Sequence, residues 1–203
     1  MRAELSSDTE TKIIEAATLV FIRKGRQGAS MQDIADEAGI NRTLLNYYFR
    51  SKDKLFDLIF EDVFLKFIPE IKNLMIIELP FLKKIEMFID NYTSVLLSNP
   101  ITPIFILHEI SNNPDRLVET IKSRGVDPDI FLNQIRSEMD KGNIIRMDPR
   151  EFTINLLSLV VFPFAAKPVL LRMLFRGNNQ AYTRFLEERK ASLKAYFLNS
   201  IKK

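Results

Sequence analysis

The stretch from Ser30 to Lys54 constrains the fold most, because it predicts two short helices joined by a tight turn. Ser30 can cap the first helix, and Asp33 three residues later completes a capping-box pattern. The apolar residues of this helix recur at i, i+3, i+4 and i+7, and Gly39 ends it. Asn41 can cap a second short helix directly after the turn. We therefore expect a helix-turn-helix.

The second helix of this stretch has two unlike faces. At about 100° per residue, four residues with donor, acceptor or aromatic groups share one arc, and four largely apolar residues share the opposite arc. The first set is Arg42, Thr43, Asn46 and Tyr47, and the second set is Leu44, Leu45, Tyr48 and Phe49. A helix with an apolar back and a donor-rich front can pack on its neighbours and read base edges in a major groove. From these residues alone, a merely solvated face remains an alternative.

Positive charge gathers directly after this helix. Arg50, Lys52 and Lys54 stand there against Asp53 alone, where flanking phosphates would lie on a duplex. The net charge of the whole chain, +3 from 29 basic and 26 acidic residues, is too small to indicate nucleic acid by itself.

The segment from Ile13 to Phe56 resembles the N-terminal domain of the TetR family of bacterial transcriptional regulators. Nine residues match the family's pattern in type and spacing: Ala17, Phe21, Gly25, Ile34, Ala35, Gly39, Phe49, Lys52 and Leu55. The chain departs from the family pattern at Thr43, where many members have Gly, and at Asn46, where many have Tyr. The resemblance implies an all-α fold, with a three-helix helix-turn-helix DNA-binding domain over residues 1–54. A helical ligand-binding and dimerisation domain follows over residues 55–203.

The resemblance also implies a function. Similar proteins are homodimeric DNA-binding regulators, commonly repressors released from a palindromic double-stranded operator by a small, largely apolar effector. Ser30, Tyr48 and Lys52 resemble phosphate contacts of the family, although Tyr48 has a core aromatic as its alternative reading. The implied DNA-binding set is Ser30, Gln32, Asn41, Arg42, Thr43, Asn46, Tyr47, Tyr48 and Lys52.

Composition narrows the classes of protein to which the chain can belong. With 203 residues and 46% hydrophobic content, the chain can bury a sizeable core. The absence of cysteine excludes disulfides and thiolate metal sites. The N-terminus has no apolar signal-peptide region. The longest uncharged run, Phe152 to Ala166, is shorter than the roughly 20 residues of a membrane span. We expect a cytoplasmic protein with no membrane partner.

Proline and glycine set off the C-terminal helices. Ser51 can cap a long helix that is apolar nearly all round, and Pro69 is expected to kink or end it, which makes residues 67–80 a candidate hinge. No sustained strand pattern occurs. Further helices are expected near 81–98, 102–111, 114–123, 128–141, 149–162, 168–176 and 180–200.

An effector cavity and a dimer surface are expected in the C-terminal domain. The family implies an effector cavity, and its candidate lining residues are Phe60, Phe64, Met75, Met87, Phe88, Asn91, Tyr92, Phe105, His108 and Phe131. Each of these could instead be plain core. Apolar seams on the helices after Asp148 and at the C-terminus predict a dimer surface: Phe152, Leu156, Leu159, Val160, Phe185, Leu186, Leu193, Tyr196 and Phe197. These seams could instead close the core of the monomer.

Catalytic patterns are lacking. His108 is the only histidine, and the chain has no phosphate loop, no nucleophile elbow and no HExxH motif. We therefore expect no enzyme, no metal and no cofactor. Two alternatives to an effector-controlled repressor remain: a DNA-binding regulator without a small-molecule pocket, and a helical ligand carrier with a degenerate helix-turn-helix.

Overall fold

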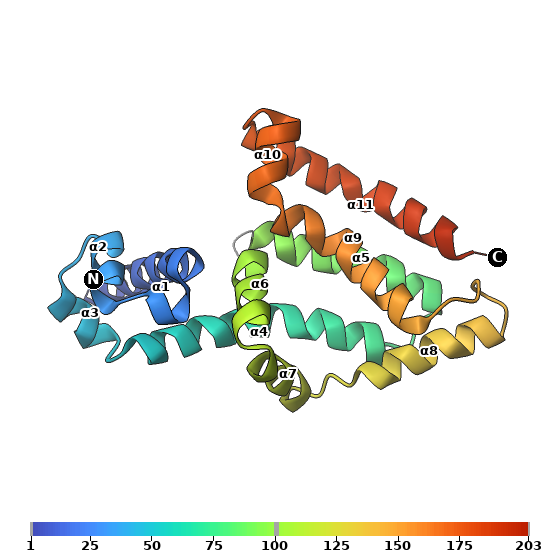
Figure 1. Ribbon diagram of the computed structural model, residues 1–203, viewed down its shortest axis with the longest axis horizontal. Helices are drawn as coiled ribbons and strands as arrows, with labels where there is room; N and C mark the ends of the chain where they lie inside the picture. The colour runs from blue at the N-terminus through green and yellow to red at the C-terminus, as the bar shows by residue number, and fades with distance from the viewer. Residues whose placement is uncertain (1, 100–101, 203) are drawn as a thin grey trace. The chain divides into compact units, whose positions relative to one another are not determined.

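The computed structural model describes residues 2–99 and 102–202, and within these residues it contains eleven α-helices and no strand (Figure 1). Their contacts divide the chain into two compact units. One unit comprises Met1–Leu65 with Ile104–Asn112, and the other comprises Lys66–Pro103 with Asn113–Lys203. The predicted all-α fold class is confirmed. The functional boundary between residues 54 and 55 stays a prediction, because the compact units follow contacts and not function.

The N-terminal unit is built around a small aromatic and aliphatic core. Phe21 and Phe56 meet edge-on with ring centroids 5.0 Å apart, and Phe105 lies 5.3 Å from Phe56. Ile34 and Leu45 of this unit are also fully buried. The unit consists of α1 (Arg2–Gly28), α2 (Met31–Ala38), α3 (Arg42–Tyr48), the start of α4 (Lys52–Ile76) and residues 104–112 of α6 (Thr102–Asn112).

The C-terminal unit is a helical bundle in which α5 lies against α9 and α11, and α8 packs on α9. Phe152 stands at its centre, with no exposed surface. The rings of Phe81, Phe131 and Phe197 surround it at centroid distances of 5.8, 6.2 and 5.2 Å. Besides the end of α4, the unit contains α5 (Phe81–Ser98), α7 (Pro114–Ser123), α8 (Pro128–Asp140), α9 (Pro149–Ala165), α10 (Lys167–Phe175) and α11 (Asn179–Ile201).

Local signals account for these helix boundaries. All seven helices expected after residue 80 are present, although α9 continues to Ala165 instead of ending near residue 162. Asp127 and Asp148 accept hydrogen bonds from the backbone N–H groups of Asp129 and Arg150, so both cap helices that begin with proline. Asn113 forms no side-chain capping bond to α7.

Pro69 was expected to kink or end the long helix, and an end there is wrong, since α4 continues through Pro69 to Ile76. A kink at Pro69 stays a prediction. Proline removes the hydrogen bond to the carbonyl four residues earlier, which belongs to Leu65. Both Leu65 and Pro69 are exposed, so water can satisfy that carbonyl, which explains why the helix tolerates the proline. The interruption coincides with the border of the two compact units at Leu65 and Lys66.

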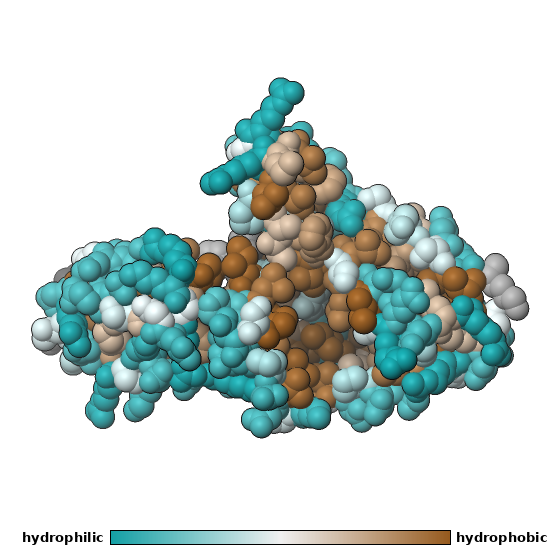
Figure 2. Space-filling model, viewed as in Figure 1, coloured by the Kyte–Doolittle hydropathy of each residue, from teal (hydrophilic) through white to brown (hydrophobic). Residues whose placement is uncertain are grey.

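The outer surface of α10 is unusually apolar for a helix with no buried residue. Val169, Met173 and Leu174 are exposed there, and Figure 2 shows apolar residues gathered on this side of the unit. Within the residues described, no single helix is long and apolar enough to cross a membrane. Only α9 and α10 taken together reach that length, across a bend of 71°.

Candidate nucleic-acid interface

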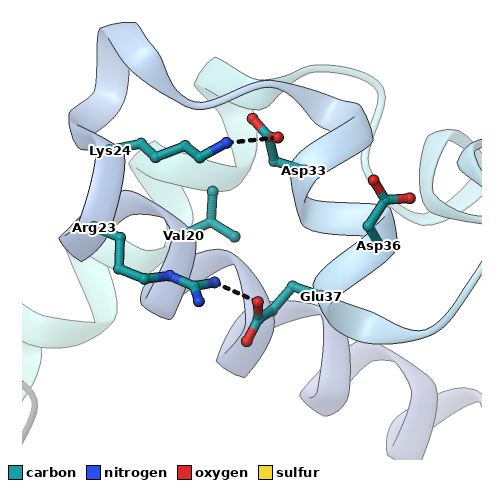
Figure 3. A pocket seen from close by; sticks show the side chains of 6 residues that line it. All are labelled: Val20, Arg23, Lys24, Asp33, Asp36 and Glu37. Carbon is teal, nitrogen blue, oxygen red and sulfur yellow. Dashed lines mark hydrogen bonds and ion pairs between the residues drawn. The ribbon is translucent and has the colours of Figure 1, made fainter.

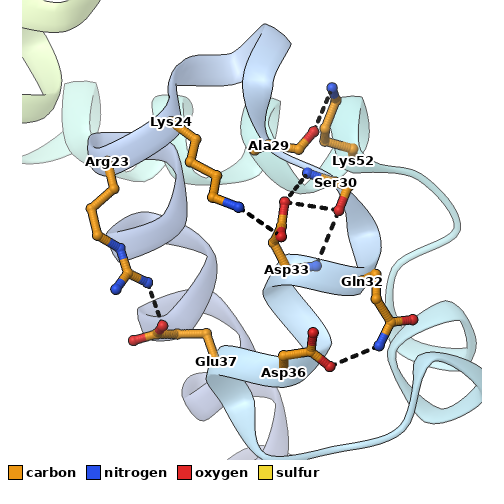
Figure 4. A network of polar contacts seen from close by, with 9 residues as sticks. All are labelled: Arg23, Lys24, Ala29, Ser30, Gln32, Asp33, Asp36, Glu37 and Lys52. Atoms are coloured by element: carbon orange, nitrogen blue, oxygen red, sulfur yellow. Dashed lines mark hydrogen bonds and ion pairs between the residues drawn. The ribbon is translucent and has the colours of Figure 1, made fainter.

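The start of α2 is fixed by a complete capping box. Ser30 Oγ accepts a hydrogen bond from the Asp33 backbone N–H at 3.1 Å, and the Ser30 backbone N–H donates to Asp33 Oδ2 at 3.0 Å (Figure 4). The Ser30 hydroxyl also donates to the same carboxylate oxygen at 2.8 Å. The capping box predicted from the sequence is therefore confirmed. It leaves the free N–H groups of the first turn of α2 at the protein surface.

The turn between α2 and α3 has the geometry expected of a helix-turn-helix. Gly39 has φ 66° and ψ 32°, a left-handed conformation that glycine adopts without steric cost. Ile40 donates its backbone N–H to Ala35 O at 3.0 Å, and its side chain is half-buried in the turn. Asn41 Oδ1 then accepts the Leu44 N–H at 2.8 Å and caps α3. The helix end predicted at Gly39 and the cap predicted at Asn41 are confirmed.

The two faces of α3 are largely as predicted. Leu45 and Phe49 are buried, while Arg42, Thr43 and Asn46 are exposed. Tyr47 is 81% exposed, so its ring lies at the surface of the domain. Leu44 differs from the prediction because it is 37% exposed. A helix of seven residues packs through the narrow line of Leu45 and Phe49, so Leu44 lies at its margin.

Tyr48 lies between the two readings that the sequence left open. Its side chain is half-buried, and its ring meets that of Tyr47 edge-on with centroids 5.5 Å apart. A ring held in this way can present its phenol at the surface while its body packs on the domain. The role of Tyr48 as a phosphate contact stays a prediction.

Three other residues that were predicted to contact DNA form hydrogen bonds within the protein. Gln32 donates its side-chain amide to Asp36 Oδ1 at 2.7 Å, and Asn41 uses Oδ1 as a cap. Lys52 Nζ donates to Ala29 O at 2.9 Å and to Gln27 O at 3.3 Å. Gln32 keeps its second amide N–H and its Oε1 for a base or phosphate contact, and the amide nitrogen of Asn41 also remains available.

The acidic side of α2 is neutralised by α1. Lys24 Nζ lies 2.7 Å from Asp33 Oδ1, and Arg23 pairs with Glu37 (Figure 4). The Lys24 ammonium and the Ser30 hydroxyl and N–H lower the pKa of Asp33 to about 2. An open pocket of about 340 Å³ lies among these charged groups, between α1 and α2 (Figure 3). Because its four paired charges and Asp36 are all engaged within the protein, we assign no ligand to this pocket.

One contribution to the basic surface was missed from the sequence. Asp53 was counted against the cluster after Phe49, but Arg26 of α1 pairs with it at 3.0 Å. The Arg26 guanidinium also lies 5.0 Å from the centroid of the Phe56 ring, a cation–π geometry. No local signal could have linked residues 27 positions apart. The pairing leaves Arg50 and Lys54 as exposed cations beside α3.

The residues expected to line an effector cavity are distributed over both compact units. Phe60, Phe64, Phe105 and His108 belong to the N-terminal unit. In the C-terminal unit, Phe88 and Tyr92 stack with centroids 5.0 Å apart, and burial raises the pKa of the Tyr92 phenol. The other members of that unit are Met75, Met87, Asn91 and Phe131. A ligand cavity at these residues stays a prediction.

The structure corrects part of the expected dimer surface. Six of its residues are inside the single chain, because α9 and α11 pack against α5 and close the core of the monomer: Phe152, Leu156, Val160, Leu186, Leu193 and Phe197. Leu159 remains half-buried, and Phe185 and Tyr196 are exposed by 39% and 65%. Leu159 and Tyr196 line a hollow of about 420 Å³ together with Arg189, whose Nε is buried without a hydrogen-bond partner.

His108 packs against the backbone of α1. Its ring occupies the space beside Gly25, where a Cβ atom would lie 2.8 Å from Cε1 and 2.9 Å from Nε2. Glu109 Oε1 is 3.9 Å from His108 Nδ1, and Asn112 donates to the His108 carbonyl at 2.7 Å. No group of three histidine, cysteine or acidic residues could hold a metal ion in the part of the chain that is described.

Comparison with known proteins supports the reading of the N-terminal unit. Residues 13–59 match the model for "Bacterial regulatory proteins, tetR family". The HTH-type transcriptional repressor NicS of Pseudomonas putida is 34% identical over 67 residues, which cover 33% of this chain and 32% of that protein. This curated relative is therefore matched over about a third of its length.

Solved structures extend the likeness in fold to the whole chain. The ketosteroid transcriptional regulator KstR2 of Mycobacterium tuberculosis has a TM-score of 0.71 at 14% identity, covering 96% of this chain and 95% of that one. The TetR family regulator PfmR of Thermus thermophilus has a TM-score of 0.66 at 18% identity, covering 94% and 96%. At these identities the likeness establishes the fold. Residues 13–59 therefore resemble the helix-turn-helix segment of the tetR family of bacterial regulatory proteins, and the chain as a whole shares the fold of these solved regulators.

Proposed function

We propose that the protein is a sequence-specific DNA-binding transcriptional regulator. The observation that carries this proposal is the exposed face of α3, where Arg42, Asn46 and Tyr47 stand clear of the domain while Leu45 anchors the helix from behind. A short helix held in this way can enter a major groove without disturbing its own packing. The matched relative NicS is named a transcriptional repressor, which supports repression as the output.

The proposed contacts with bases and phosphates follow from side-chain chemistry. Arg42 presents a guanidinium fork suited to O6 and N7 of guanine, and Asn46 presents an amide suited to N6 and N7 of adenine. Thr43 and Tyr47 offer a methyl group and a ring for thymine methyls or the sugar-phosphate backbone. Arg50 and Lys54 supply positive charge for flanking phosphates. Ser30 places the N-terminus of α2, with its free N–H groups and partial positive charge, toward a phosphate.

We also propose that the protein acts as a homodimer on a palindromic operator. The surface left for a partner includes Phe185, Tyr196 and the hollow lined by Leu159 and Arg189. Two α3 helices in one dimer would then need to lie about 34–36 Å apart, or a multiple of a helical turn, to reach successive major grooves.

The proposed control is an apolar effector in the C-terminal unit. Its aromatic residues, among them Phe88 and Tyr92, could form the walls of such a site. An effector that prefers the non-binding conformation by about 1–3 kcal/mol would weaken operator affinity about 5- to 150-fold. A regulator without a pocket remains the second candidate. A dye-displacement assay separates the two candidates, because a solid core binds no dye that a ligand could displace.

Single substitutions on α3 test the proposal. Duplexes are first selected from random sequence with the wild-type protein, and the selection is repeated with Arg42→Ala and Asn46→Ala. We expect each variant to lose preference at one position per half-site, with about 1–3 kcal/mol lost for the original base. Glu10→Ala, an exposed change on α1, is the control and should select the wild-type sequence. Unchanged preferences in both α3 variants would show that this face does not read the DNA and would favour the ligand-carrier alternative.

A further inference from the structure

Lys52 connects the first residue of α4 to the segment that joins α1 and α2. Its ammonium donates to Ala29 O at 2.9 Å and to Gln27 O at 3.3 Å (Figure 4). Gln27 is the last but one residue of α1 and Ala29 directly follows the helix, so both carbonyls lie where backbone acceptors have no partner within a helix. Two of the three N–H groups of the Lys52 ammonium therefore form hydrogen bonds within the protein.

These bonds act on the peptide unit that begins the helix-turn-helix. The carbonyl of Ala29 accepts from Lys52, and the N–H of the same peptide, which belongs to Ser30, donates to Asp33 Oδ2 at 3.0 Å. Both polar groups of one peptide plane are thus held, one by α4 and one by α2. The orientation of this plane determines the direction in which α2 starts, and α3 follows α2 across the Gly39 turn.

The position of Lys52 in α4 also indicates a role outside its own helix. A cation in the first turn faces the positive end of the helix dipole, which is unfavourable. The same charge is favourable beside the carbonyl oxygens of Gln27 and Ala29, which carry partial negative charge. Lys54 provides a contrast, because it lies in the same turn with an exposed side chain.

We propose that Lys52 is a positioning residue for DNA recognition, which holds the Ala29–Ser30 peptide and with it the direction of α2 and α3. Its effect on sequence recognition comes through the orientation of the two helices and not through a bond to phosphate. The inference rests on the proposed DNA-binding function.

The test compares Lys52→Met with Lys54→Met. Affinities are measured by fluorescence anisotropy over a range of salt concentrations, for the duplex selected with wild-type protein and for a scrambled duplex of the same composition. We expect Lys52→Met to weaken binding of the selected duplex about tenfold, with the scrambled duplex and the salt slope nearly unchanged. Lys54→Met should weaken both duplexes alike and reduce the slope by about 0.9 for each phosphate that the protein no longer neutralises.

Lys52→Gln separates a hydrogen-bond donor from a charge. Glutamine keeps a neutral donor, although one bond shorter than lysine, so we expect a partial recovery of the affinity that Lys52→Met loses. A phosphate contact predicts instead that the two neutral variants bind equally weakly. The proposal is overturned if Lys52→Met behaves like Lys54→Met. It is also overturned if Lys52→Met lowers the melting temperature and leaves both affinities of the folded protein unchanged, since the role would then be structural only.

Amide hydrogen exchange keeps this test independent of the proposed function. If wild-type protein fails to distinguish the selected duplex from the scrambled one, the DNA-binding proposal fails whatever the variants do. The positioning of the peptide then still predicts faster exchange of the Ser30 amide in Lys52→Met than in Lys54→Met. Equal exchange in the two variants would contradict the positioning role, also where Lys52→Met binds no DNA at all.

Discussion

Gly25 combines two constraints at one residue of α1. Its φ of 70° and ψ of 170° belong to a region that only glycine adopts readily, and the His108 ring occupies the space of a side chain. We expect Gly25→Ala to lower the free energy of unfolding by about 2 kcal/mol or more, measured by urea denaturation. Combining it with His108→Ala should recover only the steric part, in a double-mutant cycle. Strict additivity of the two changes would show that the ring does not constrain this position.

Asp33 makes the stability of the helix-turn-helix depend on pH. Its folded-state pKa of about 2 is below the ordinary value of 3.8, chiefly because of its hydrogen bond with Lys24. A lowered carboxyl pKa stabilises the folded state at pH above the ordinary value, and this contribution is lost as the pH falls from about 4 to about 2. We expect Lys24→Met to raise the pKa of Asp33, followed by carboxyl NMR titration. An unchanged titration midpoint would contradict the assigned cause.

At the scale of the element, two asparagines of α3 and its N-cap have different roles. Asn41 caps the helix with a bond of 2.8 Å, whereas Asn46 is exposed on the outer face. We expect Asn41→Ala to cost about 1 kcal/mol of stability and Asn46→Ala to change it by less than about 0.5 kcal/mol. The opposite order should hold for the specific-to-scrambled binding ratio, because only Asn46 is proposed to read a base. Thermal denaturation and anisotropy measure the two quantities, and equal stability losses would contradict the capping role.

Most helices could be predicted because their signals are local. Asp127 and Asp148 before prolines, and Gly39 in its left-handed turn, act on the few residues around them, so their helix ends were confirmed. Whether the helix ends at Pro69 could not be predicted, because the effect of proline depends on whether the carbonyl of Leu65 is exposed to water. Exposure of that kind depends on packing, which a local pattern does not contain.

Packing at the scale of the whole molecule could be predicted only in part. Periodicity identified the apolar faces of α9 and α11 but not what covers them, so Phe152 and Phe197 were expected at a dimer surface and lie in the core of the monomer. The grouping of residues 104–112 with the N-terminal unit was also missed. It depends on contacts between distant segments, such as those of Phe105 with Phe56 and His108 with Gly25.

The proposed dimer can be tested on the same helices. Phe185→Asp combined with Tyr196→Asp should give a monomer with unchanged helical content, because both side chains are exposed in the single chain. Sedimentation velocity and circular dichroism measure the two properties. Ala191→Asp, an exposed change on another face of α11, is the matched control and should remain dimeric. A double variant that stays dimeric would place the partner surface elsewhere.

The most direct test of the DNA-reading account is the ratio of two dissociation constants of the wild-type protein. One is for its selected duplex, and the other is for a scrambled duplex of equal length and composition, both at physiological salt. A regulator that reads sequence through α3 predicts a ratio of about 10³ or more in favour of the selected duplex. Equal affinity for both duplexes would mean that the exposed face of α3 carries no sequence information, and the account would be wrong.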